Sequence, residues 1–212
     1  MLFYDRHEAG RLLAKKLMPF IGQQNTLVLG LARGGVVVAY EVAKALSLPL
    51  NVLVPRKVGA PGNPELALGS IMEDGEGVFN SSIIKILGVS QTFLKQEIEK
   101  EKIRAHQRLT LYREHAPLPD IKGHTIILVD DGIATGSTML ASIKAMRKAE
   151  AQKIIVAVPV SSTDAMQHME EAADEVVCLY CPEDFFGVGQ FYSHFGQTED
   201  EEVVKLLKEG NK

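Results

Sequence analysis

Short apolar runs alternate with amphipathic stretches along most of the 212-residue chain. Apolar runs bounded by polar residues or glycine predict buried strands, here at 26–31, 51–54, 126–129, 153–160 and 175–180. Apolar positions at helical spacing predict helices, here at 5–18, 35–46, 91–113, 137–149 and 163–173, with a last one after Thr198. Strands that are apolar on both faces and alternate with helices predict the α/β class, with a mostly parallel central sheet covered by helices on two sides.

Capping residues indicate where three of these helices begin. Asp5–Glu8 and Thr198–Glu201 both have the spacing of a capping box. Ser90 precedes the helix 91–113, which is heavily charged and carries only a thin apolar stripe, made of Leu94, Ile98, Ile103, Leu109 and Tyr112. We therefore expect this helix to project from the protein or to pack along one edge only.

The segment 56–78 interrupts the alternation of strands and helices. It holds five glycines together with Pro61 and Pro64, a composition that favours turns and mobility. A further proline turn is expected at Pro117–Pro119. The length fits one domain, which we expect to span 1–212, with a flexible loop and helical excursion at about 56–118 and a small C-terminal hood or tail at about 181–212.

Charge and composition exclude several functions. A net charge of −4 and a pI near 5.9 lack the basic surplus of a nucleic-acid-binding protein. There is no apolar run of about 18 residues and no secretory signal, so no membrane partner is expected. Cys178 and Cys181 lie in an apolar run without a second pair at zinc-site spacing. They are interpreted as buried structural thiols, and a reducing cytoplasm is the expected location.

Candidate chemistry is concentrated in the segment 126–138, IILVDDGIATGST. Its strand ends at Asp130 and Asp131, adjacent carboxylates that repel each other unless cations or hydroxyl donors lie nearby. Small residues then lead into a helix N-terminus, where free amides and the helix dipole favour a phosphate; they are Ile133, Ala134, Thr135, Gly136, Ser137 and Thr138. No lysine follows Gly136, so the segment is not a P-loop. The alternative is a capped turn on a solvated edge.

Two other strand ends carry glycines or positive charge. Arg33, Gly34 and Gly35 follow the first strand, and Arg56 and Lys57 follow the second. Ligands of open parallel sheets bind beyond the carboxyl ends of the strands, so we expect both segments to share one rim with 130–138. Taken alone, they also fit a Gly-Gly turn into a helix and a solvated basic turn.

The segment 126–138 resembles the motif that binds phosphoribosyl pyrophosphate (PRPP) in type I phosphoribosyltransferases, and all 13 positions fit. The resemblance continues in chain order over 26–180, and the tail VGQFYSHFGQTEDEEV is similar to that of an uncharacterised branch of predicted phosphoribosyltransferases. It implies the type I phosphoribosyltransferase fold, with Asp130 and Asp131 at the ribose hydroxyls and 133–138 around the 5-phosphate. It also implies a pyrophosphate site, often with a cis peptide, made of Arg33, Gly34, Gly35, Arg56 and Lys57.

The resemblance further implies transfer of the phosphoribosyl group to a nitrogen acceptor that resembles a nucleobase, with release of pyrophosphate, as in nucleotide metabolism. The catalytic residues would be Asp130, Asp131, Arg56 and Lys57. The cofactor would be Mg²⁺, which the two acids reach indirectly through PRPP or water. A homodimer is usual in such enzymes. Ala134 replaces the aspartate that hypoxanthine-guanine enzymes use as proton acceptor, so the acceptor molecule stays open.

Other interpretations remain open. The same fold can serve as a PRPP- or nucleotide-sensing module without activity, and a hydrolase would require a nucleophile–base pair that the sequence does not present. The aromatic tail can stack on a base or simply pack on the core, through Phe185, Phe186, Phe191, Tyr192 and Phe195. Candidate proton acceptors are Glu65, Glu73 and Glu76. Lys100, Arg104 and Arg108 can reach the diphosphate or form a solvated helix face.

Overall fold

The predicted apolar strands form one parallel sheet. Its order is β2-β1-β6-β7-β8, built from β1 (Thr26–Leu31), β2 (Leu50–Leu53), β6 (Thr125–Val129), β7 (Lys153–Val160) and β8 (Glu175–Tyr180). Every neighbouring pair is parallel. The computed structural model describes residues 2–114 and 118–212, without the side chain of Glu65, so part of the predicted turn at Pro117–Pro119 lies outside the described residues. The predicted α/β class is confirmed.

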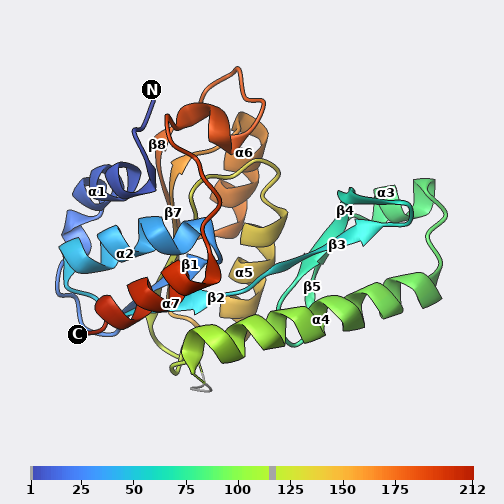
Figure 1. Cartoon of the computed structure of the whole chain (residues 1–212), viewed down its shortest axis with the longest axis horizontal. Helices are drawn as coiled ribbons and strands as arrows, with labels where there is room; N and C mark the ends of the chain where they lie inside the picture. Colours follow the sequence, from blue (N-terminus) through green and yellow to red (C-terminus); the bar gives the residue numbers. More distant parts are fainter. Residues whose placement is uncertain (1, 115–117) are drawn as a thin grey trace.

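Helices cover both faces of this sheet, as Figure 1 shows. Alternate residues of β6 face opposite sides, because Ile127 and Val129 belong to one core cluster and Ile126 and Leu128 to the other. The first cluster is completed by α1 (Arg6–Lys16), α2 (Gly34–Leu46) and α7 (Asp200–Glu209). The second is completed by α5 (Ser137–Lys148) and α6 (Thr163–Ala172). No helix of the described residues is both long and apolar enough to cross a membrane.

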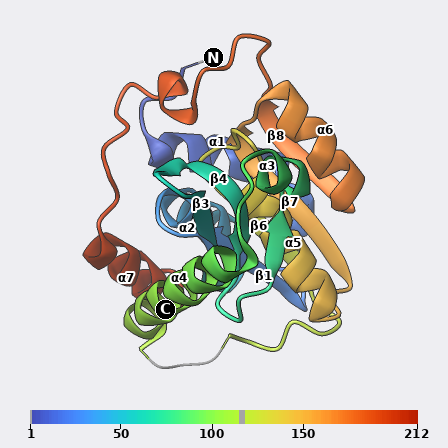
Figure 2. The same cartoon turned by 90° about the vertical axis from the view of Figure 1, so that its right-hand side faces the viewer.

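A second region projects from the sheet, as Figure 1 shows, and Figure 2 views it from its outer end. We call residues 56–113 the arm and the rest of the chain the body. The arm holds the antiparallel sheet β3-β4-β5, followed by two helices; its elements are β3 (Arg56–Ala60), β4 (Asn63–Ile71), β5 (Gly77–Phe79), α3 (Ser81–Ile86) and α4 (Gln91–Arg113).

The expectation of a glycine-rich loop at 56–78 is wrong, because most of this segment is β-sheet. Three of its glycines serve close contact between strands. A Cβ atom added to Gly59 would lie 2.7 Å from the backbone oxygen of Pro64. Added to Gly69 it would lie 2.3 Å from the backbone oxygen of Val78, and added to Gly77 it would lie 1.9 Å from that of Ser70. Side chains would therefore push the strands apart. Of the five glycines in 56–78, only Gly62 and Gly75 have a positive φ and serve the turns.

The long helix α4 has the predicted bounds, and the Ser90 hydroxyl accepts a hydrogen bond from the Phe93 amide at 3.1 Å. Its apolar stripe differs from the prediction. Leu109 and Tyr112 are buried, whereas Ile103 is 54% exposed. The first buried residue along α4 is instead the charged Glu101, whose side chain is 4% exposed. A charged residue therefore lies on the inner face of the arm.

Two smaller expectations also fail. Helix α7 begins at Asp200 with Glu199 at the N-cap, so the predicted capping residue Thr198 lies one position too early, and it is buried. Cys178 is only partly buried and Cys181 is exposed, because β8 is the edge strand of the sheet. Burial raises the pKa of the Cys178 thiol to about 11, so this thiol stays protonated and unreactive at neutral pH.

Candidate active site

The carboxyl ends of β1, β2 and β6 bring the three predicted segments to one rim. Leu31 pairs with Leu53, and Gly30 pairs with Val129, so the loops that follow these strands leave the sheet side by side. The peptide bond between Ala32 and Arg33 is cis. A pocket of about 740 Å³ opens at this rim and is lined by Ala32, Arg56, Lys57 and Thr138 from the three predicted segments, whereas Asp130 and Asp131 lie outside its lining. The predicted common rim is therefore confirmed.

The two glycines of the first loop pack directly against the two acids. A Cβ atom on Gly34 would lie 2.0 Å from Oδ2 of Asp131, and one on Gly35 would lie 2.8 Å from Cα of Asp130. The Asp131 amide donates to Oδ1 of Asp130 at 2.8 Å. No side chain fits between this loop and the carboxylates, which explains why two glycines follow Arg33.

The acidic pair lacks full compensation of its charge. Burial raises the pKa of Asp130 well above its ordinary value, and the neighbouring charge of Asp131 raises it further. Burial also raises the pKa of Asp131, although the nearby Arg6 guanidinium opposes this shift. A cation or a set of hydroxyl donors placed here would stabilise the ionised pair.

Arg6 is a residue of the site that the sequence did not indicate. Its Nε donates to Oδ2 of Asp131 at 2.7 Å, and both side chains are largely buried, with 12% and 15% exposed. Its Nη1 donates to the Gly196 oxygen at 2.7 Å, and the guanidinium lies 3.9 Å from the ring centre of Phe195. The Tyr192 hydroxyl donates to the Asp131 carbonyl at 2.6 Å. The second acid is thus held by the first helix and the C-terminal tail together.

The loop before α5 leaves its amides open. Gly136 is the N-cap of α5 with φ of 79°, a conformation that glycine adopts without strain. Ile133 is different from its neighbours, because its amide donates to the Val160 oxygen at 2.9 Å and its side chain is buried. It anchors the loop, and its amide is not free for a phosphate. From Ala134 to Thr138, no amide donates to a backbone oxygen of the described residues.

Two of the three predicted cations of the site, Arg33 and Arg56, already contact carboxylates. Arg33 lies 3.4 Å from Glu199 and 3.7 Å from Asp200, at the start of α7. Nε of Arg56 donates to the buried Glu101 at 2.7 Å. Lys57 is exposed at the edge of the 740 Å³ pocket. These contacts hold Arg33 and Arg56 in place near the rim.

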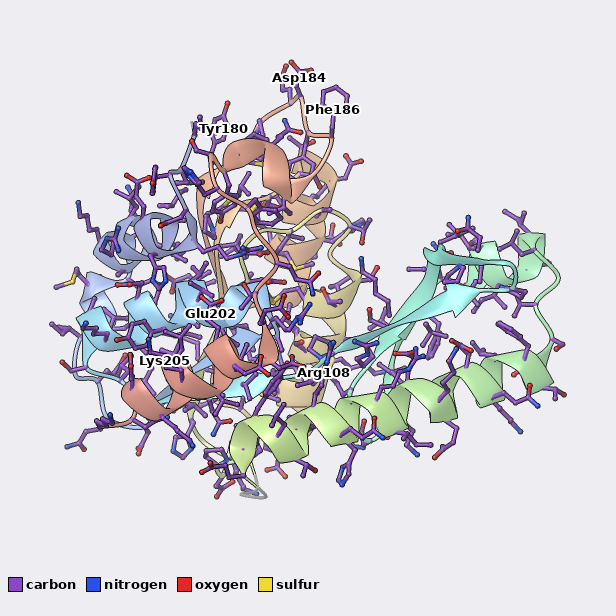
Figure 3. The ribbon with its side chains drawn as sticks, viewed as in Figure 1. Arg108, Tyr180, Asp184, Phe186, Glu202 and Lys205 are labelled. Atoms are coloured by element: carbon purple, nitrogen blue, oxygen red, sulfur yellow. The ribbon has the colours of Figure 1, made fainter. Side chains whose placement is uncertain are left out.

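The aromatic tail divides into packing and exposed residues. Phe191 and Tyr192 are buried, and Phe185 packs against Phe191 at 5.4 Å between ring centres. Phe195 is 38% exposed, and its ring stacks on Tyr192 at 5.0 Å. Phe186 is 93% exposed at the outer loop beside Asp184, as Figure 3 shows. Packing therefore explains three of the five rings, and Phe195 is partly exposed and contacts Arg6, which in turn pairs with Asp131.

Two of the three acidic candidates of the arm do not line the 740 Å³ pocket. Glu73 is 3.8 Å from Arg113. Glu76 is 2.7 Å from Lys148, which lowers the Glu76 pKa. The side chain of Glu65 lies outside the described residues. Neither Glu73 nor Glu76 lines the pocket, so the described geometry does not favour either as a proton acceptor there.

A metal would depend on the substrate for most of its ligands. Within the described residues, no group of three or more His, Cys, Asp or Glu side chains could hold a metal ion. Mg²⁺ characteristically uses one or two carboxylates together with water and substrate phosphates. The under-compensated carboxylates of Asp130 and Asp131 fit that ligand set.

Known proteins of similar sequence add independent information. A family model described as "Phosphoribosyl transferase domain" matches residues 5–195. A Mycobacterium tuberculosis protein, provisionally named as a phosphoribosyl transferase, is 44% identical over 206 residues. That match covers 97% of this chain and 46% of the relative, so the chain spans about half the relative's length.

Solved structures agree with this match. The crystal structure of a Thermus thermophilus protein has a TM-score of 0.83 and 42% identity, and the match covers 100% of both chains. The structure of a purine phosphoribosyltransferase from Pyrococcus horikoshii has a TM-score of 0.50 and 18% identity, over 92% of each chain. The second likeness concerns the fold alone.

Proposed function

The chain belongs to the phosphoribosyltransferase family, and on this premise we propose that it binds PRPP with Mg²⁺ and transfers the phosphoribosyl group to a nitrogen acceptor resembling a nucleobase. The observation that carries the proposal is the arrangement of Asp130 and Asp131. The pair is packed against two glycines, lies where burial raises the pKa of Asp130 well above its ordinary value, and is followed at once by open amides at a helix N-terminus.

In the proposed reaction, a nitrogen–carbon bond forms at C1 of the ribose while the bond from C1 to the diphosphate oxygen breaks. The diphosphate leaves with the bonding electron pair, and the acceptor nitrogen loses its proton to the leaving diphosphate or to water. The amides from Ala134 to Thr138 would hold the 5-phosphate. The carboxylates of Asp130 and Asp131 would accept hydrogen bonds from the ribose hydroxyls and stabilise the positive charge that develops on the sugar.

The leaving diphosphate requires positive charge on the other side of the pocket. Arg56 and Lys57 would supply it from the arm, and Arg33 from the loop after β1, with the loop amides beside it. Bound Mg²⁺ would neutralise part of the diphosphate charge. Because Arg33 and Arg56 already contact carboxylates, the diphosphate would share or displace those contacts.

The acceptor would lie on the face of the ribose opposite the diphosphate if the displacement proceeds with inversion. On the body side, the exposed ring of Phe195 lies beside Arg6, which itself contacts Asp131. A flat base would meet the exposed part of this ring, which already packs against Arg6 and Tyr192. This position is compatible with a nucleobase-like acceptor and does not define which one.

The test is Asp130→Asn, measured as pyrophosphate release from PRPP with a panel of nucleobases. We expect the most active acceptor to lose about 10²–10³ in kcat/KM, because one charge that acts in the transition state is removed. Asp120→Asn, in an exposed loop, should retain full activity. PRPP binding and turnover that stay unchanged in Asp130→Asn would refute the site assignment.

A PRPP-sensing module without transfer activity is the second candidate. The contacts of Arg33 with Glu199 and of Arg56 with Glu101 favour it, because a sensor needs cations that change partners when the ligand arrives. The same assay separates the two functions. A wild-type protein that binds PRPP, but releases no pyrophosphate with any acceptor, is a sensor.

A further inference from the structure

Three arginines line a second pocket next to the candidate active site. This pocket of about 470 Å³ lies between α4 and the start of α7, with walls made of Arg56, Arg104, Gln107, Arg108, Leu111 and Asp200. Figures 1 and 2 both show α7 beside α4, and Figure 3 marks Arg108 on the part of α4 near α7. Arg56 and Arg104 also line the 740 Å³ pocket. The two pockets therefore share a wall.

The shared wall is fixed by the buried carboxylate of Glu101. Its two oxygens accept from Nε of Arg56 and from Nη1 of Arg104, and the Glu101 side chain is 4% exposed. Each guanidinium has further N–H donors, and these are not engaged by Glu101. The carboxylate thus orients both arginines without occupying all of their donors.

The remaining charges leave the second pocket positive. Arg108 makes no ion pair within the described part of the chain. Asp200 is the one acid among the residues that line the pocket; it accepts a hydrogen bond from Tyr112 and lies 3.7 Å from Arg33. Arg56 and Arg104 share the carboxylate of Glu101, and Asp200 already has other partners, so the guanidinium of Arg108 contributes the positive charge that is left unpaired.

Converging arginines favour one ligand chemistry. The planar guanidinium fork matches the oxygen atoms of phosphate and binds them with two parallel hydrogen bonds. Gln107 and the half-exposed Leu111 add an amide and an apolar surface beside the arginines. We propose that this pocket binds a phosphorylated small molecule while PRPP occupies the first pocket, which makes it a second anion site.

Inorganic pyrophosphate is the probe, titrated by calorimetry into the full chain saturated with PRPP and Mg²⁺. PRPP then fills the first pocket, so added pyrophosphate can bind only in the second. We expect one pyrophosphate per chain, and binding weakened by on the order of tenfold in Arg108→Gln, because a charged hydrogen-bonding partner is removed. Arg108→Gln should bind PRPP itself as well as the wild type does.

Lys100→Gln is the matched control. Lys100 lies two turns before Arg108 on the same helix and lines only the first pocket, so its loss should leave the binding of the added pyrophosphate unchanged. The inference is overturned if the PRPP-loaded protein binds no pyrophosphate, or if both variants weaken that binding equally. Unchanged thermal unfolding of Arg108→Gln shows that the variant is folded.

Simultaneous binding with PRPP rests on the proposed function, but the second anion site can also be tested apart from it. If the protein fails to bind PRPP, pyrophosphate is titrated into the free chain, and a site that is sensitive to Arg108→Gln but not to Lys100→Gln supports the second site on its own. A free chain with no such site overturns the inference. Failure of the proposed function would appear separately, as absence of PRPP binding.

Discussion

The body and the arm bring opposite charges to the same rim of the parallel sheet. The body carries Asp130 and Asp131 at the end of β6 and the open amides before α5, whereas the arm lines the 740 Å³ pocket with Arg56, Lys57 and the α4 cations Lys100 and Arg104. A ligand with a ribose at one end and a diphosphate at the other would need both regions. The chemistry of this site is therefore divided between the edge of a buried sheet and a projecting arm.

Glycine has a different use in each region. In the body, Gly34 and Gly35 allow a loop to lie against two acids, and in the arm Gly59, Gly69 and Gly77 allow strands to approach each other. Replacing glycine by alanine should therefore lower the activity when it is done in the body, and loosen the strand pairing when it is done in the arm. This difference can be tested directly.

Gly34→Ala should have the largest effect. The new Cβ atom would lie 2.0 Å from Oδ2 of Asp131, so the loop or the acid must move by about an ångström or more. Displacement on this scale reduces rates by about 10² or more, and we expect kcat/KM for PRPP to fall by roughly 10²–10³. Steady-state pyrophosphate release measures the effect.

Gly187→Ala is the control for that substitution. Gly187 has extended backbone and nothing within 4 Å of its added Cβ atom, so this variant should keep its activity. If Gly34→Ala also keeps its activity, the contact between the loop and the acids does not matter for function, and the division between body and arm loses its chemical basis.

Arg6→Ala should have the next largest effect. It removes the ion pair that opposes the raised pKa of Asp131, so that pKa should rise further and the carboxylate should become neutral at a higher pH. We expect kcat/KM to fall by about tenfold, and the acid side of the pH profile to shift upward. Arg6→Lys should restore part of the activity and of the profile.

Arg11→Ala is the matched control for Arg6. It lies on the same helix and is 3.6 Å from Glu41, but it is 57% exposed and remote from the acids. Its pH profile should match that of the wild type. A profile that does not move in Arg6→Ala would show that Arg6 only stabilises the packing of α1 and the tail.

Gly69→Ala should have the smallest and most local effect. Its Cβ atom would lie 2.3 Å from the Val78 oxygen and would separate β4 from β5. Amide hydrogen exchange in 63–79 should become about tenfold faster, whereas exchange in β6 and β7 should not change. If amide hydrogen exchange became faster by the same factor in 63–79 and in β6 and β7, the arm and the body would unfold together.

Ser70→Ala provides the comparison on the same strand. The Ser70 hydroxyl is buried and has no hydrogen-bond partner among the described residues. Its removal leaves no partner unsatisfied, so exchange in the arm should stay the same or slow down.

The sequence predicted the body well because its signals are local. An apolar run between polar residues specifies a buried strand, and each of the five strands was placed within one residue. The motif at 126–138 combines a strand end, two acids and a helix start within 13 residues. All of its parts are neighbours in the chain, so their spatial relation follows from the sequence.

The arm and several site contacts were not predictable in this way. Arg6 meets Asp131 across 125 positions, and Arg56 meets Glu101 across 45. Glu101 lies within a charged helix, where a buried carboxylate has the same sequence pattern as a solvated one. The glycines of 56–78 indicate turns by composition, because only the partner strand shows that three of them serve close packing.

The position of the arm in the chain has a consequence for evolution. The chain leaves the body once, after β2, and returns once, at β6, so the arm is a single uninterrupted insertion. β1 lies between β2 and β6 in the sheet, and no strand pairing of the body depends on the insertion's length. Changes in the strands of the arm would therefore alter the ligand pocket without shifting the register of the parallel sheet, whereas the end of α4 is tied to the body by Ala105, Leu109 and Tyr112, which belong to its core.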